Sequence, residues 1–140
     1  GYHVHFKGHD HLLSRPVIFL NKAFGITPME QGLRVVGTVE FGGLDNPLNK
    51  KRILNLVNNA KYLFPELSEH YDEWLGFRPT LPDYLPVMGP SKNYKNLFYS
   101  FGHHHLGWTL GAISGKIISE MVAGDNTNLN LEPYSSLRFS

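Results

Sequence analysis

Runs of apolar, aromatic and β-branched residues in the first third of the chain predict β-strands. The runs are separated by glycine and by polar residues, a composition typical of short strands. Gln31 and Gly32 favour a hairpin turn between the last two of them. Because neighbouring strands joined by short turns pair antiparallel, we expect an antiparallel sheet. The expected strands cover Tyr2–Phe6, residues 16–20, Phe24–Met29 and residues 33–41.

Two later segments carry apolar residues at helical spacing. The first covers residues 53–64, and Asn49 before it is a suitable N-cap. The second covers residues 110–121. A run of aromatic and apolar residues at 96–101 predicts a buried strand between the two helices. The tail after residue 125 is polar, and we expect it to be irregular.

Composition narrows the classes of protein that fit this pattern. The 140 residues suit one domain, and 41% hydrophobic against 18% charged residues allows a buried core. Thirteen basic and twelve acidic residues leave a net charge of +1, too small to indicate a nucleic-acid or membrane surface. The chain has no cysteine, which excludes disulfides, cysteine-ligated metals and a thiol nucleophile. The chain begins at Gly1 directly in strand-like sequence, so we expect a fragment of a longer protein.

Arg78 is the first candidate for chemistry. It lies in a segment, residues 76–89, that three prolines stiffen, and the proline after it biases it to extended backbone. The planar guanidinium of an arginine donates two parallel hydrogen bonds to a carboxylate, so Arg78 could hold an acidic substrate. A structural ion pair with Asp83 is the alternative, and the spacing leaves both open.

The second candidate is a turn between a strand and a helix, at residues 98–111. Such a junction presents backbone N–H groups that have no partner inside the helix. Gly102 and Gly107 would let a planar or anionic group approach the backbone closely. An ordinary strand–helix turn explains the pattern equally well.

Histidines raise the question of a metal site. The side chains of His103, His104 and His105 diverge because the residues are consecutive, so they do not converge on one ion. His3 and His5 point to one strand face and, with His9 and His11, could form an adventitious site. We expect no functional metal. The sequence also lacks the Gly-x-Ser-x-Gly and phosphate-loop patterns of esterases and nucleotide-binding proteins.

Two motifs together resemble a known family. Gly-x-Arg-Pro-x-x-Pro-Asp-x-x-Pro starts at Gly76, and Gly-His-x-x-x-Gly-x-Thr-Leu starts at Gly102. In this order they are similar to the C-terminal part of the family of D-amino-acid oxidase, glycine oxidase and the small subunit of bacterial D-amino-acid dehydrogenase, all FAD-dependent. The Leu-Gly-Trp-Thr sequence from Leu106 is closest to the dehydrogenase branch.

The resemblance implies an α+β fold in two parts. Residues 1–75 would be part of the substrate domain, an antiparallel sheet with flanking helices. Residues 76–140 would contact flavin and substrate and include the last strand and helix of the flavin-binding domain.

The implied reaction is the oxidation of D-amino acids, or of related amines such as glycine and sarcosine. Hydride passes from the substrate to FAD, and the resulting imine hydrolyses to a keto acid and ammonia. Arg78 matches the arginine that binds the substrate carboxylate, and Tyr2 matches a tyrosine that lines the amino-acid pocket. Thr38 and Glu40 would lie on a strand of the same wall. The turn would face the pyrimidine end of the flavin, through Gly102, His103, Leu106, Gly107, Trp108, Thr109 and Leu110.

The family's N-terminal dinucleotide-binding unit, with its glycine fingerprint, has no counterpart in this sequence. We therefore expect the missing N-terminal part of the same protein to be a partner of this chain. We also expect the isolated chain to be inactive. The small-molecule partner would be an amino acid, no nucleic acid is expected, and self-association stays open. A cytoplasmic location is implied, with attachment to the inner face of the cell membrane as the alternative. A non-catalytic carboxylate-binding or interaction module is the competing hypothesis. The account requires Arg78 and the glycine turn to face one cavity.

Overall fold

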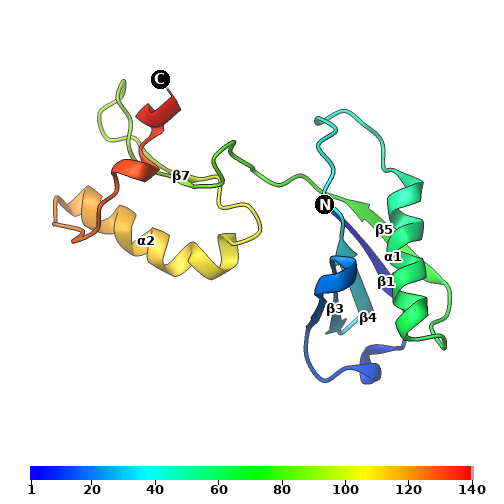
Figure 1. The fold of residues 1–140 in the computed structure, drawn as a ribbon. Coiled ribbons are helices and arrows are strands. Elements are labelled where there is room, and N and C mark those ends of the chain that lie inside the picture. The colour runs from blue at the N-terminus through cyan, green and yellow to red at the C-terminus, as the bar shows by residue number, and fades with distance from the viewer. Residues whose placement is uncertain (140) are drawn as a thin grey trace. The chain divides into compact units, whose positions relative to one another are not determined.

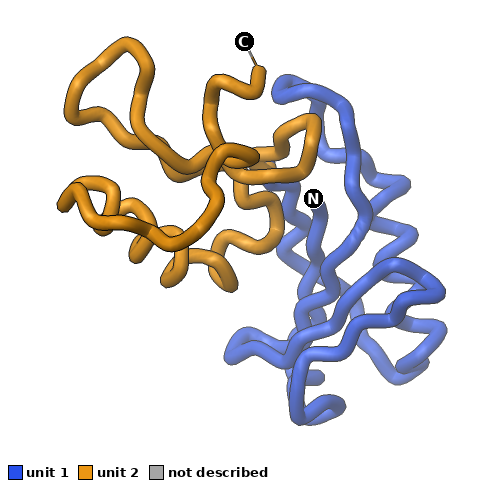
Figure 2. Tube along the Cα trace, turned by 60° about the vertical axis from the view of Figure 1, so that its left-hand side comes forward, with its two compact units in different colours: residues 1–77 blue, residues 78–140 orange. Residues whose placement is uncertain are grey.

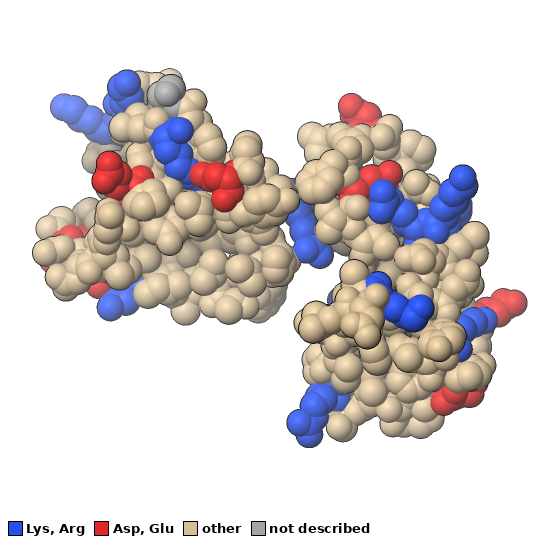
Figure 3. All heavy atoms as spheres, viewed as in Figure 1, with Lys and Arg blue, Asp and Glu red and all other residues tan. Residues whose placement is uncertain are grey.

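The computed structural model describes residues 1–139. The chain forms two compact units, unit 1 (Gly1–Phe77) and unit 2 (Arg78–Ser140), coloured separately in Figure 2. The chain is α+β, as predicted, with an antiparallel sheet in each unit. Basic and acidic side chains are scattered over the visible face of both units without a large patch of one sign (Figure 3).

Unit 1 is built on a five-stranded sheet with the order β2-β3-β4-β1-β5. Every neighbouring pair is antiparallel, which confirms the predicted antiparallel sheet and its β3–β4 hairpin. Strand β1 pairs with β4 and β5 and not with β2, so the sheet is not a simple meander. Short 3₁₀ turns cover Asp10–Leu12 and Leu20–Lys22. The last strand was not predicted. The strands are β1 (Tyr2–Phe6), β2 (Val17–Phe19), β3 (Phe24–Met29), β4 (Gly32–Gly37) and β5 (His70–Leu75).

Helix α1 (Lys50–Leu63) covers one face of this sheet (Figure 1). It begins where predicted, because the Asn49 side chain accepts a hydrogen bond from the Lys51 backbone N–H at 3.0 Å. Alternate residues of the strands and one stripe of the helix form the core of unit 1. Its fully buried members include Val4, Phe6, Ile26, Leu33, Val35, Leu56 and Ala60.

Strand β4 ends at Gly37 rather than at residue 41. Thr38 adopts a left-handed backbone with φ of 56°, which no extended strand accommodates. The prediction that Thr38 and Glu40 lie on a strand is therefore wrong. Glu40 lies in the following loop, where its carboxylate pairs with Arg52 of α1 at 3.3 Å.

Unit 2 consists of a two-stranded antiparallel sheet, β6 (Val87–Pro90) and β7 (Phe98–Phe101), packed against helix α2 (Gly107–Ala123). The prediction of a buried strand here is wrong, since β7 is half-buried to exposed in so small a sheet. The tail contains 3₁₀ turns at Glu132–Tyr134 and Ser136–Phe139. Within residues 1–139, neither helix has the combination of length and hydrophobicity needed to cross a bilayer.

Candidate active site

Arg78 and the start of α2 line one pocket of unit 2. The pocket has a volume of about 600 Å³. This confirms the central geometric prediction, that the arginine and the glycine turn face the same cavity. The lining residues are Arg78, His104, His105, Gly107, Trp108 and Gly111.

Arg78 is available to a ligand because the Asp83 carboxylate is already paired with Arg138. Arg138 donates from Nε to Asp83 Oδ2 at 2.5 Å and from Nη2 to Asp83 Oδ1 at 3.2 Å. The alternative in which Arg78 pairs with Asp83 is therefore wrong. Within the described part of the chain, the Arg78 side chain has neither an ion pair nor a hydrogen bond. An exposed guanidinium without a protein carboxylate beside it is suited to an acidic ligand.

The proline-rich segment that carries Arg78 rests directly on the glycine turn. Gly102 has φ of 81°, and a Cβ added there would lie 2.5 Å from Leu81 Cδ1. The left-handed backbone favours glycine here, and a larger residue would have to displace the Leu81 side chain. Farther along, the ring of Tyr84 stacks on that of His104, with centroids 4.8 Å apart. These two contacts place the Arg78 segment beside the start of α2.

The first turn of α2 is suited to negative charge. The backbone N–H groups of Gly107, Trp108 and Thr109 have no acceptor within residues 1–139, and no acidic side chain lies in that turn. The Trp108 side chain is fully exposed. A Cβ added at Gly111 would meet nothing within 4 Å, so the surface is open to a flat group. The residues present therefore fit the electron-rich end of a flavin ring.

The other predicted flavin contacts are distributed differently. His103 Nε2 lies 2.9 Å from the hydroxyl of Ser114, which is only 4% exposed, so this pair ties the turn to α2. Leu106 and Leu110 line a separate apolar cavity of about 370 Å³, together with residues of the tail such as Leu131. Of the seven predicted contacts, Gly107 and Trp108 line the pocket that contains Arg78. A flavin-contacting role stays a prediction for all seven.

Tyr2 belongs to unit 1, where it is part of the core and only 3% exposed. Its hydroxyl donates to the Glu40 carboxylate and accepts from the Asn49 backbone N–H at 3.3 Å. Burial, followed by the Glu40 hydrogen bond, raises the pKa of the Tyr2 hydroxyl, and the hydrogen bond from Tyr2 lowers the pKa of Glu40. These contacts give Tyr2 a packing role in unit 1, and its contact with substrate stays a prediction.

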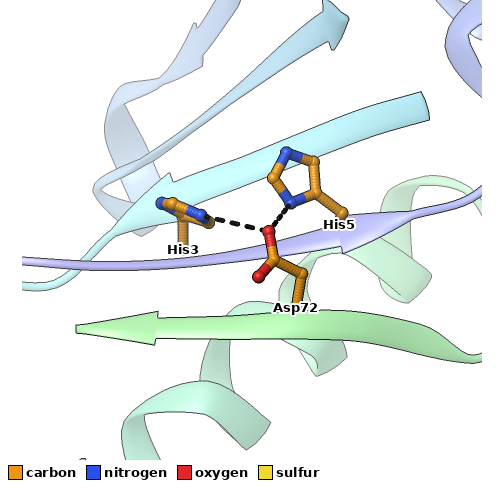
Figure 4. Close-up of side chains that lie close together, drawn as sticks. All are labelled: His3, His5 and Asp72. Atoms are coloured by element: carbon orange, nitrogen blue, oxygen red, sulfur yellow. Dashed lines mark ion pairs between the residues drawn. The ribbon is translucent and has the colours of Figure 1, made fainter. Parts of the chain in front are cut away.

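His3 and His5 of β1 gather with Asp72 of β5 (Figure 4). His5 Nδ1 lies 2.9 Å from Asp72 Oδ2, and His3 Nε2 lies 3.8 Å from the same oxygen. The prediction that His9 and His11 would complete this cluster is wrong, since His9 bonds to Ser68 instead.

Arg34 gives the cluster an explanation that needs no ion. Its Nε donates to His5 Nε2 at 2.9 Å, which leaves the proton of a neutral His5 on Nδ1, the nitrogen that lies 2.9 Å from Asp72 Oδ2. A cation would have to displace that proton beside a guanidinium. Burial, followed by the charge of Arg34, also lowers the pKa of His3.

Comparison with known proteins connects both units to one family. The sequence profile of the family described as FAD-dependent oxidoreductase matches residues 1–121. The D-amino-acid oxidase of Bradyrhizobium diazoefficiens is 30% identical over 99% of this chain and 34% of its own length. D-amino acid dehydrogenase 3 of Mesorhizobium japonicum is 40% identical over 66% of this chain and 23% of its own length.

A similar fold occurs in the crystal structure of glycine oxidase from Bacillus cereus ATCC 14579. It superimposes with a TM-score of 0.75 and 26% identity over 92% of this chain and 37% of its own. The chain thus spans well under half of each of these three proteins.

Proposed function

The chain belongs to the FAD-dependent oxidoreductase family, and from this premise we propose that its protein oxidises D-amino acids or related amines such as glycine and sarcosine. The observation that carries the proposal is the shared pocket. An arginine with no carboxylate partner among residues 1–139 lines the same cavity as the open first turn of α2.

In this proposal Arg78 binds the substrate carboxylate. The segment that carries it is stiffened by proline and held against the turn by Leu81 and Tyr84. Such a segment loses little backbone conformational entropy on binding, so Arg78 would be presented to the substrate at a low entropic cost. Hydrogen bonds to a charged group contribute about 1.5–3 kcal/mol, enough to select amino acids over amines that lack the carboxylate.

The first turn of α2 would hold the pyrimidine end of the flavin. FAD, when bound, would supply the two-electron oxidant that takes the hydride from the substrate Cα–H bond, and hydrolysis of the resulting imine would give an oxo acid and ammonia, or an amine from an N-alkylated substrate. The free N–H groups of Gly107, Trp108 and Thr109, at the positive end of the helix dipole, would stabilise the negative charge that develops near that end of the ring.

The test uses the full-length protein and compares Arg78→Met with the wild type. The substrates are a D-amino acid and the corresponding amine without its carboxylate. Arg15→Met is the control, because Arg15 is exposed, belongs to unit 1 and is not among the residues that line the pocket. We expect kcat/KM for the amino acid to fall about 100-fold while that for the amine changes little.

Two results would contradict the proposal. A correctly folded full-length protein with no flavin absorbance would favour the non-catalytic carboxylate-binding module instead. Equal losses for the amino acid and the amine would remove Arg78 from carboxylate recognition.

A further inference from the structure

Arg138 connects the end of the chain to the proline-rich segment. Besides its two bonds to Asp83, it donates from Nη2 to the backbone carbonyl of Leu85 at 2.7 Å. Its Nη1 donates to the carbonyl of Ser135 at 3.0 Å, which holds the guanidinium on its own turn. The Arg138 side chain is only 14% exposed. The Arg138 side chain therefore donates hydrogen bonds to both a carboxylate and a backbone carbonyl of the segment that begins with Arg78.

These hydrogen bonds lie at the turn that sets the shape of the proline-rich segment. Asp83 Oδ1 also accepts a hydrogen bond from the Leu85 backbone N–H at 3.1 Å, which closes a tight turn around Tyr84. Tyr84 itself has a left-handed backbone with φ of 61°. A non-glycine residue persists in that conformation only where its surroundings hold it. The hydrogen bond from Arg138 is also the main cause of the lowered pKa of Asp83, so the carboxylate stays charged and paired.

We propose that Arg138 is a positioning residue for Arg78, which it serves in two ways. It fixes the turn at residues 83–85 and thereby the direction of the segment that carries Arg78. It also neutralises Asp83, the acidic residue of unit 2 that is nearest to Arg78 in the sequence, and so keeps the Arg78 guanidinium available to a substrate carboxylate. This inference rests on the role of Arg78 in the proposed function.

The positioning role does not follow from the family match. That match ends at residue 121, whereas Arg138 lies in the tail beyond it. No short motif in the sequence indicates that Asp83 and Arg138 form a pair, since the two residues are 55 positions apart.

The experiment uses the full-length protein with its flavin bound. The variants are Arg138→Met, Asp83→Asn, and the charge exchange Asp83→Arg with Arg138→Asp, with Arg15→Met as the control. For each we measure flavin content, and kcat and KM separately, with a D-amino acid and with the corresponding amine. Asp83→Asn keeps the shape of the side chain and serves as the test if Arg138→Met does not fold.

We expect Arg138→Met and Asp83→Asn to raise KM for the amino acid about tenfold, as when hydrogen bonds to one charged group are lost at a partly exposed position. The kinetics with the amine and the flavin content should not change. The charge exchange should bring KM back to within about threefold of the wild type, because the two sites are coupled.

The outcomes separate this inference from the proposed function. If Arg78→Met loses carboxylate selectivity while Arg138→Met and Asp83→Asn keep it, the positioning role is overturned and the proposed function stands. If amine and amino acid kinetics fall together with flavin content, Arg138 is merely structural, and the inference is again overturned. If Arg78→Met itself leaves the selectivity unchanged, the assigned role of Arg78 is overturned, and the positioning role of Arg138 with it.

Discussion

Replacing Gly102 by alanine should disrupt the pocket at the point where the proline-rich segment meets the turn. The added Cβ would lie 2.5 Å from Leu81 Cδ1, and φ of 81° is unfavourable for any residue with a Cβ. The left-handed backbone costs about 1–2 kcal/mol, and inserting a methyl group into a packed contact costs about 1–3 kcal/mol. Because the end of a leucine side chain can move, we expect about 2–4 kcal/mol of lost local stability.

Gly115→Ala is the matched control. Gly115 lies in α2, and a Cβ added there meets nothing within 4 Å. Alanine should therefore stabilise the helix by about 0.5–1 kcal/mol through its higher helix propensity. The two substitutions add the same methyl group with opposite expected signs.

Amide hydrogen exchange of the full-length protein, read by mass spectrometry on peptides from residues 98–115, measures the effect locally. Exchange in Gly102→Ala should be roughly 30- to 700-fold faster than in the wild type, and in Gly115→Ala somewhat slower. If the two variants exchange alike, the close approach of Leu81 to Gly102 is wrong, and with it the reason that the Arg78 segment lies beside α2.

Three further predictions concern the framework of the two units. Leu56→Ala removes a fully buried side chain and should lower the unfolding free energy of unit 1 by about 2–5 kcal/mol, whereas Leu54→Ala, at an exposed position, should cost under about 1 kcal/mol in a denaturant titration. Ser114→Ala removes the buried hydroxyl that lies 2.9 Å from His103 Nε2 and should speed exchange at the start of α2 by about tenfold; unchanged exchange would mean that the pair does not hold the turn. The pKa of His3 is lowered in the folded protein, so between that value and the usual 6.5 the unfolded chain binds more protons and stability rises with pH. His3→Gln should flatten this rise in denaturation midpoints measured across that range, and an identical pH dependence would contradict the assignment.

The residue pattern of a short segment was sufficient to predict those elements that local interactions determine. The bounds of β1 and β3 and the Asn49 cap of α1 follow from β-branched and aromatic runs and from one capping side chain. Strand β5 was missed because its sequence, HYDEWL, shows no clear alternation; its pairing with β1 includes a bulge between His3 and His5. That strand exists through long-range pairing that no short window of sequence contains.

The same distinction applies to the site. Arg78 and Gly107 could be identified because they lie in short motifs, and the structure places them in one pocket. The partner of Asp83 could not be identified, since Arg138 reaches it only after the polar tail has folded back. Spacing along the chain left Arg78 open as that partner, and tertiary structure decided otherwise.

The most direct test of the account is a titration of the full-length flavoprotein with a keto acid, followed by the visible absorbance of the flavin. A carboxylate held by Arg78 in the pocket beside the first turn of α2 should perturb that spectrum and saturate. We predict that Arg78→Met raises the Kd for the keto acid by about 10- to 100-fold. A spectrum that the keto acid does not perturb, or an affinity unchanged by the substitution, would contradict the claim that the arginine and the flavin-facing turn serve one cavity.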